Sequence, residues 1–557
     1  MKKINLLISF SVIILSVSAQ NVGIGTATPV GKLHVVGSAN VSQLIIDANS
    51  AQSNTNPLIK LRNSAGTDLM WIHSDNINNT FIGLNAGRVN NAAGGGVNNT
   101  FIGSGSGYSN TTGNLNTANG YYALYSNITG NNNTANGFRA LYSNTIGNEN
   151  TANGLQALGN NTIGFNNTAV GNYALYSNTT ASYNTAIGVS ALFLQSFNNG
   201  GTAWNSNNVA VGNEALFSNQ PISTASGANN TAVGNFALRS NTLGSSNTAT
   251  GLQALFYNSY GSENTANGSQ SLYYNSGGSS NTANGFQSLY YNNIGNFNTA
   301  NGYQALFYNN TGTRNTANGF QSLYQNISGY GNTATGIGAL RANTFGHSNT
   351  AIGSYAGDVN TVGYYNIAIG YNSGNLYDNL NNTIGIGNDG YLPGASNQVI
   401  IGNNSTTFIG GKVNWSLASD ARIKNKVTED VKGLDFISRL RPVTYYLNNK
   451  AMTTITGNKE TPDFPEKNDI EKIKFSGFIA QEVEQAAKGA GYDFSGVAIP
   501  KKSTELYTLR YAEFVVPLVK AVQEQQAMIV TQQKIIDELK KQMAEIKREI
   551  GLLKKKN

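Results

Sequence analysis

A 17-residue pattern, N-T-A-x-G-x-x-A-L-x-x-N-x-x-G-x-x, recurs through most of the 557-residue chain. Copies begin at Asn116 and at every seventeenth residue to Asn184, and again at every seventeenth residue from Asn230 to Asn366 after two irregular spacings. Weaker copies lie on either side of this region. A period of this length does not fit helix-pair repeats or heptads, and it suits one coil of a β-solenoid per repeat.

The residue types within the repeat predict the shape of each coil. Ala, Val or Ile at the third and fourth positions predicts a short strand. Gly at the fifth and fifteenth positions is expected to supply the positive φ of a corner. Asn at the first and twelfth positions is expected to tolerate the same conformations and to stack its side-chain amide from coil to coil.

The ninth position of thirteen successive repeats is Leu, and the eighth is Ala or Ser. We expect this column to lie inside the solenoid, because an exposed column of leucines would be an aggregation stripe. Tyr and Phe are frequent at the tenth position and should stack along the axis, as a chain–chain contact or as an external binding strip. The predicted core leucines are Leu124, Leu141, Leu158, Leu175, Leu192, Leu216, Leu238, Leu255, Leu272, Leu289, Leu306, Leu323 and Leu340.

The N-terminus has the features of a secretory signal peptide. Lys2 and Lys3 precede an apolar run at 6–17, and small residues at 17–19 suit a cleavage site. The alternative, an uncleaved membrane anchor, fits poorly because the apolar run is short for a bilayer. We therefore assign residues 1–19 to a signal peptide and expect a secreted or cell-surface protein without an integral membrane segment.

Composition excludes several kinds of site. The chain has no Cys and three scattered His residues, so we expect no thiolate chemistry, no metal site and no cofactor. Lys and Arg in the 411–557 segment alternate with acids, which indicates a solvated surface rather than a nucleic-acid-binding one. The six acids at 79–410 are not expected to pair within one coil, although glycoside hydrolysis needs two nearby carboxylates.

The sequence divides into five parts. After the signal peptide, residues 20–78 predict a small β domain with strands at 32–36, 43–46, 58–62 and 69–73. The solenoid shaft is assigned to 79–410, a small α/β domain to 411–512 and a coiled coil to 513–557. In the α/β domain we expect structured segments at 419–431, 434–440 and 443–447, a polar loop at 448–471, a strand at 475–480 and a helix at 481–488.

Apolar residues near the C-terminus alternate at spacings of four and three without a break. This pattern predicts a coiled coil, in which Gln525 and Gln532 are polar layers that fix the register. Ile at both a and d positions is compatible with three strands, so we expect a homotrimer, although the pattern does not exclude another oligomer. The predicted apolar seam consists of Leu518, Val522, Ile529, Ile536, Leu539, Met543, Ile546, Ile550 and Leu553.

Three motifs in order, S-D-A-R-I-K from Ser419, L-R-P-V from Leu440 and G-F-I-A-Q-E-V from Gly477, precede this coiled coil. Together they resemble the intramolecular chaperone domain of endosialidase tailspikes and related tail fibres. That resemblance implies that the domain trimerises the β-rich fibre upstream and then cuts itself off. The cut would fall between Ala418 and Ser419, with Ser419 as nucleophile and Lys424 as its partner. The repeats also resemble the head repeats of trimeric autotransporter adhesins.

The residues around Ser419 leave an alternative open. Ser419 could be a helix N-cap and Lys424 an exposed helical residue, because positions five apart in a helix point about 140° apart. The pair meets only if the helix is broken. Arg422 and Lys426 would favour a neutral lysine, whereas Asp420 would oppose it unless its carboxylate points elsewhere.

The sequence thus favours an exported trimeric fibre with a C-terminal chaperone. Near-identical repeats can pair one coil out of register at little cost, and a C-terminal coiled coil holds three chains in one register. The alternative is an adhesin that binds a glycan or another cell-surface ligand and keeps a non-cleaving trimerisation domain. An insertion at 197–205 that contains Trp204 is then the expected specialised patch.

Overall fold

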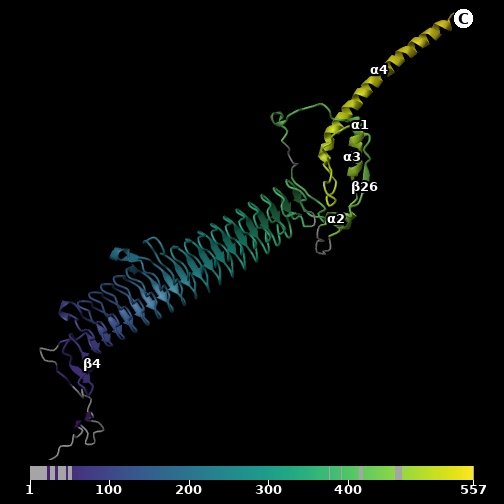
Figure 1. The fold of residues 1–557 in the computed structure, drawn as a ribbon. Coiled ribbons are helices and arrows are strands. Elements are labelled where there is room, and N and C mark those ends of the chain that lie inside the picture. The colour runs from purple at the N-terminus through teal and green to yellow at the C-terminus, as the bar shows by residue number, and fades with distance from the viewer. Residues whose placement is uncertain are drawn as a thin grey trace, which may run out of the picture. The chain divides into compact units, whose positions relative to one another are not determined.

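The computed structural model describes residues 22–24, 32–35, 45–47, 53–375, 377–389, 392–412, 418–457 and 467–555. The expected signal peptide lies outside the described residues. The chain divides into two compact units, Met1–Gln156 and Ala157–Asn557. In both units the repeats form β-solenoid coils, about 19 turns in all, which confirms the predicted fold (Figure 1).

The first unit begins with short strands outside the repeat. β1 (Val22–Ile24) pairs in parallel with β2 (Leu33–Val35). β3 (Ile59–Arg62) pairs antiparallel with β4 (Asp68–His73), and β4 pairs antiparallel with the first coil strand. The strands expected at 32–36, 58–62 and 69–73 are therefore present. In the segment expected at 43–46, Ile45 and Ile46 are not in a strand. The coil strands, paired in parallel, are β5 (Thr80–Ile82), β6 (Thr100–Ile102), β7 (Thr117–Asn119), β8 (Thr134–Asn136) and β9 (Thr151–Asn153).

The second unit continues the repeat with strands of three residues that pair in parallel, and most of them are Thr–Ala–x segments aligned with the next. This register keeps every repeat position in line from coil to coil. The strands are β10 (Thr168–Val170), β12 (Thr185–Ile187), β14 (Val209–Val211), β15 (Thr231–Val233), β16 (Thr248–Thr250), β17 (Thr265–Asn267), β18 (Thr282–Asn284), β19 (Thr299–Asn301), β20 (Thr316–Asn318), β21 (Thr333–Thr335), β22 (Thr350–Ile352), β23 (Ile367–Ile369), β24 (Ile384–Ile386) and β25 (Val399–Ile401).

Leucine, alanine and asparagine fill the interior of each coil. The ninth-position leucines from Leu124 to Leu323 have no exposed surface, and Leu340 is 2% exposed. The strand alanines beside them are also buried. Towards the C-terminal end of the repeats, Gly357 and Gly374 replace the leucine, as expected for atypical terminal repeats.

The buried asparagines form two hydrogen-bonded ladders, as predicted. At the twelfth position, the Nδ2 of Asn309 donates to the Oδ1 of Asn292 in the preceding coil at 2.6 Å. At the first position, the backbone N–H of Asn298 donates to the Oδ1 of Asn281 at 2.9 Å. Both side chains of a coil also donate to one carbonyl, that of Gly312, at 2.8 and 3.0 Å. The buried amides are thereby satisfied, which a buried polar group requires.

The corner conformations differ in part from the prediction. Fifth-position glycines have positive φ, such as +133° at Gly302, but fifteenth-position glycines such as Gly312 do not. A Cβ at Gly312 would overlap the Asn309 amide and the carbonyl of Gly329, so lack of space explains this glycine. The buried asparagines are not left-handed either; the left-handed residues of the same coil are Gln304, Leu306 and Arg314.

Tenth-position rings stack from coil to coil, as predicted. The ring centroids of Tyr273 and Tyr290 lie 5.0 Å apart and those of Tyr290 and Phe307 lie 5.1 Å apart, in nearly parallel planes. In the insertion that was expected to form a specialised patch, Trp204 is buried. Trp204 lies in β13 (Trp204–Asn205), which pairs with β11 (Ala181–Ser182), and its ring is 5% exposed because it packs edge-on against Phe197.

The C-terminal α/β region contains α1 (Leu434–Ile437), β26 (Val443–Tyr445), α2 (Asn449–Thr456), β27 (Phe475–Gly477), α3 (Ala480–Gly489), β28 (Val497–Ala498), β29 (Thr508–Leu509) and the long helix α4 (Val515–Leu553). β26 and β27 pair antiparallel, as do β28 and β29. Two expectations were wrong. The 448–471 segment is not all loop, because α2 forms behind an Asn448 cap, and 419–431 holds only one short 3₁₀ turn.

Candidate autoproteolytic site

A single 3₁₀ turn, η3 (Ala421–Ile423), lies at the start of the C-terminal domain between two extended residues. Asp420 precedes this turn as its N-cap, and its Oδ1 accepts the backbone N–H of Arg422 at 2.8 Å. Lys424 ends the turn in an extended conformation. The predicted alternative, a regular helix capped by Ser419, is therefore not formed.

The turn brings together the two residues that the family resemblance had paired. The Nζ of Lys424 donates a hydrogen bond to the Oγ of Ser419 at 2.7 Å. Five residues apart, they meet because the backbone does not continue as a helix. Both residues and Ala418 are exposed in the single chain. The contact thus supplies the geometry of a serine–lysine pair without a covered environment.

Asp420 is paired with Arg422 rather than with Lys424. The Arg422 Nη2 lies 2.6 Å from the Asp420 Oδ2. This hydrogen-bonded guanidinium lowers the pKa of the Asp420 carboxyl, and the backbone N–H of Arg422 lowers it further. Because the Asp420 carboxylate is paired with Arg422, it no longer opposes a neutral Lys424. The same ion pair offsets the positive charge of Arg422, which would otherwise favour the neutral lysine.

The other two motifs contact each other. The guanidinium of Arg441 binds the Glu482 carboxylate through two nitrogens, with Nε at 3.0 Å from Oε2, and this pairing lowers the pKa of Glu482. The Tyr511 hydroxyl accepts the backbone N–H of Phe478 at 3.0 Å. The buried centre of the domain consists of Phe436, Val483, Ala486, Ala487, Ala490, Phe494 and Phe514.

The domain is joined directly to the long helix. The Oε2 of Glu524 in α4 accepts the backbone N–H of Leu434 at 2.7 Å and so caps the N-terminus of α1. Pro517 and Ala521 of α4 are buried. Sequence reasoning missed Glu524, because a cap supplied from 90 residues away leaves no local signal. It also missed the capping role of Asp420, which an Asp directly before a short turn can indicate.

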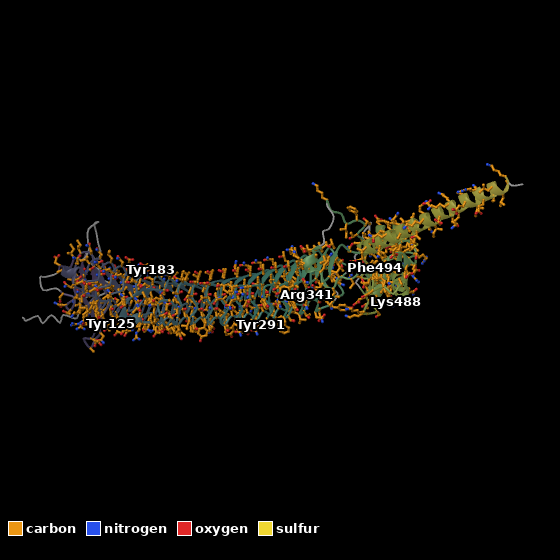
Figure 2. All side chains as sticks on the ribbon, turned by 90° about the horizontal axis from the view of Figure 1, so that it is seen from above. Tyr125, Tyr183, Tyr291, Arg341, Lys488 and Phe494 are labelled. Atoms are coloured by element: carbon orange, nitrogen blue, oxygen red, sulfur yellow. The ribbon has the colours of Figure 1, made fainter. Side chains whose placement is uncertain are left out.

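Beyond this junction α4 presents its apolar residues to solvent. The nine predicted seam residues are between 45% exposed, at Ile536, and 65% exposed, at Leu553. Figure 2 shows the side chains of this part of the helix projecting without a packed neighbour. An apolar stripe along one helix is stable only when another surface covers it, so the seam requires a partner.

Residues 419–492 match the family model described as the chaperone of endosialidase, Peptidase_S74. The chain carries an endosialidase chaperone domain. Such domains act in trimeric fibres, and here the domain follows a β-solenoid shaft. The match begins at Ser419, the first residue of the serine–lysine pair. A search of curated proteins found no match to the chain.

None of the helices described here has the length and hydropathy needed to cross a bilayer. Among the described residues, no group of three or more His, Asp or Glu side chains has a geometry that could hold a metal ion.

Proposed function

We propose that the protein is an exported homotrimeric fibre whose C-terminal domain assembles the three chains and then cuts itself off between Ala418 and Ser419. The contact of 2.7 Å between Lys424 Nζ and Ser419 Oγ, at the first residue of the matched domain, carries the proposal. The basic and apolar N-terminal sequence supports export to the cell surface or beyond it.

The proposed reaction is an attack on the adjoining peptide bond. Ser419 Oγ bonds to the carbonyl carbon of Ala418 while its proton passes to a neutral Lys424 Nζ. The bond from that carbon to the Ser419 nitrogen then breaks as the lysine returns the proton to the nitrogen. An ester now links Ala418 to Ser419 Oγ. Water hydrolyses it, leaving a carboxylate on Ala418 and Ser419 as a new N-terminus.

Activation of this pair depends on assembly. A lysine acts as a base only when neutral, and burial favours the neutral form. Because Ser419 and Lys424 are exposed in a single chain, we propose that neighbouring chains cover them in the trimer. Cleavage then follows trimerisation, and the chaperone is released after the shafts are aligned.

The repeat explains why such a chaperone is needed. Thr282 pairs with Thr299 and Thr299 with Thr316, so a slip of one coil restores almost the same contacts. A coiled coil at one end raises the local concentration of the chains and fixes a common starting point. It also offsets the slow closure of non-local β pairing.

Intact mass of the purified chain under denaturing conditions tests the cleavage. The wild-type chain should give a C-terminal fragment that begins at Ser419, and Ser419→Ala and Lys424→Met should both abolish it. Ser438→Ala, an exposed serine in the same domain, should cleave normally. Full-length chain alone in every sample, from a preparation shown to be trimeric, would remove the peptidase claim.

A second candidate is a fibre whose C-terminal domain remains attached as a permanent trimeric foot. The observation that favours it is the open position of the pair, in which the lysine donates to the serine and neither residue is covered. In this case Ser419→Ala leaves both the mass and the assembly of the chain unchanged.

A further inference from the structure

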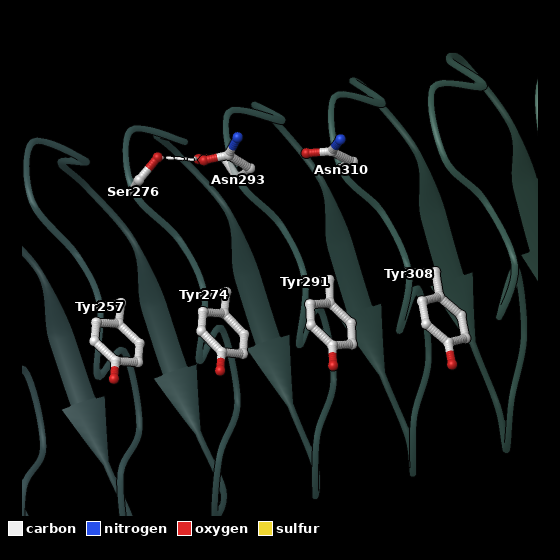
Figure 3. A pocket seen from close by; sticks show the side chains of 7 residues that line it. All are labelled: Tyr257, Tyr274, Ser276, Tyr291, Asn293, Tyr308 and Asn310. Atoms are coloured by element: carbon white, nitrogen blue, oxygen red, sulfur yellow. Dashed lines mark hydrogen bonds between the residues drawn. The ribbon is translucent and has the colours of Figure 1, made fainter.

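Four tyrosines form a row on the outside of the second unit. Tyr257, Tyr274, Tyr291 and Tyr308 occupy the eleventh position of successive coils (Figure 3). Their ring centroids are 5.1–5.5 Å apart and their planes are within 5° of parallel. Each is between 40% and 44% exposed. The stacked faces cover one another, so the row presents ring edges and hydroxyls to solvent.

A groove of about 440 Å³ lies along this row. Its other wall consists of Ser276, Asn293 and Asn310, the thirteenth-position residues of three coils, as Figure 3 shows. The Ser276 hydroxyl and the Asn293 amide are hydrogen-bonded to each other. No charged side chain lines the groove, which therefore offers apolar edges, hydroxyls and amides.

We propose that this groove binds a neutral glycan whose chain runs parallel to the stack of coils. Amide and hydroxyl groups can both donate to and accept from sugar hydroxyls, while tyrosine offers an apolar body with a polar tip. With one tyrosine per coil, the spacing of 5.1–5.5 Å between neighbouring rings is close to the length of one sugar in an extended chain. The lack of charge disfavours phosphorylated or carboxylated polymers. The volume is within the range of ordinary ligand pockets.

The extent of the row distinguishes a ligand from a neighbouring shaft. Tyrosine occupies the eleventh position only in these four coils of the repeat, between Ser240 on one side and Gln325 on the other. A side-by-side contact between aligned shafts would use the whole column, whereas a short oligosaccharide needs only a few coils. The proposal rests on the proposed function in one respect, namely that a fibre displays this face outside the cell.

The test uses the full trimeric chain and electrophoresis through gels that contain a neutral polysaccharide (glucomannan, xylan or laminarin) or anionic alginate. We expect retardation by at least one neutral polymer and none by alginate. Tyr274→Ala combined with Tyr291→Ala should weaken the binding about tenfold or more. Tyr303→Ala, an exposed ring at the sixth position, should bind within about twofold of wild type because it lies outside the groove.

Further variants separate binding from folding. Tyr274→Phe with Tyr291→Phe keeps the stacked rings and removes two hydroxyls, so binding should weaken without loss of the solenoid. Retardation by no neutral polymer, or unchanged retardation of the double alanine variant, would overturn the glycan site. Loss of trimer mass in the double alanine variant would show instead that the row contacts another shaft. Trimer mass and cleavage, measured on the same samples, report separately on the proposed fibre function.

Discussion

Most coils bury two asparagine amides, and their hydrogen bonds tie one coil to the next. The repeat predicted stacked amides, because Asn recurs at two fixed positions. It did not predict that one glycine carbonyl accepts from both side chains of a coil, as Gly312 does. That acceptor depends on the path of the corner, which no local pattern specifies.

Asn292→Ala should destabilise its coil by about 1–3 kcal/mol, because it leaves the buried side-chain oxygen of Asn275 without its donor and removes one of the two acceptors of the Asn309 amide. Asn293→Ala is the matched control, since its side chain is exposed. Hydrogen exchange of amides in the same coil measures the difference. Equal protection in the two variants would contradict the structural role of the ladder.

His73 should make the first unit sensitive to mild acid. Its ring lies between Trp71 and Phe81, and burial lowers its pKa below 6.5 despite the opposing effects of Asp75 and the backbone of Ala86. The unfolded chain therefore binds a proton first as the pH falls, so stability is complete above pH 6.5 and declines below it.

Thermal melting of the first unit between pH 7 and pH 5 checks this prediction, since carboxyl groups titrate mostly below that range. His73→Phe keeps an aromatic ring between its neighbours and should flatten the pH dependence. A wild-type melting temperature that is constant over the range would show that His73 accepts a proton equally well in the folded state.

At the scale of the element, the strand and the leucine column could be predicted because each recurs at one phase of the repeat. The left-handed conformation of Leu306 could not, since a leucine prefers other regions by about 1–2 kcal/mol. Packing of the buried side chain and pairing with neighbouring coils override that preference. The fifteenth-position glycine was predicted for the wrong reason, because crowding rather than φ selects it there.

Gly302→Ala should destabilise its coil strongly. The residue has φ +133°, and an added Cβ would lie 2.6 Å from the carbonyl oxygen of Gly319. Strain alone costs about 1–3 kcal/mol, and the backbone contact adds to it. Gly277→Ala is the control, because its φ is not positive and the nearest atom to its Cβ would be 3.8 Å away. Urea unfolding should separate the two variants; similar midpoints would argue against the described corner.

At the scale of the whole molecule, the order of three motifs and the four–three spacing sufficed to predict an endosialidase chaperone domain and a long helix. The contact between Ser419 and Lys424 could be anticipated only from the family, because helical geometry separates positions five apart. The structure shows the local reason: Asp420 and Arg422 close a single turn.

Native mass of the Ser419→Ala chain, which keeps the chaperone attached, tests whether the C-terminal region assembles three chains. We expect three times the chain mass. Ile536→Asp places a charge in the seam and should give single chains, whereas Lys534→Asp, on the outer face of the helix, should remain trimeric. A single-chain mass for Ser419→Ala, or a trimer that survives Ile536→Asp, would contradict the account.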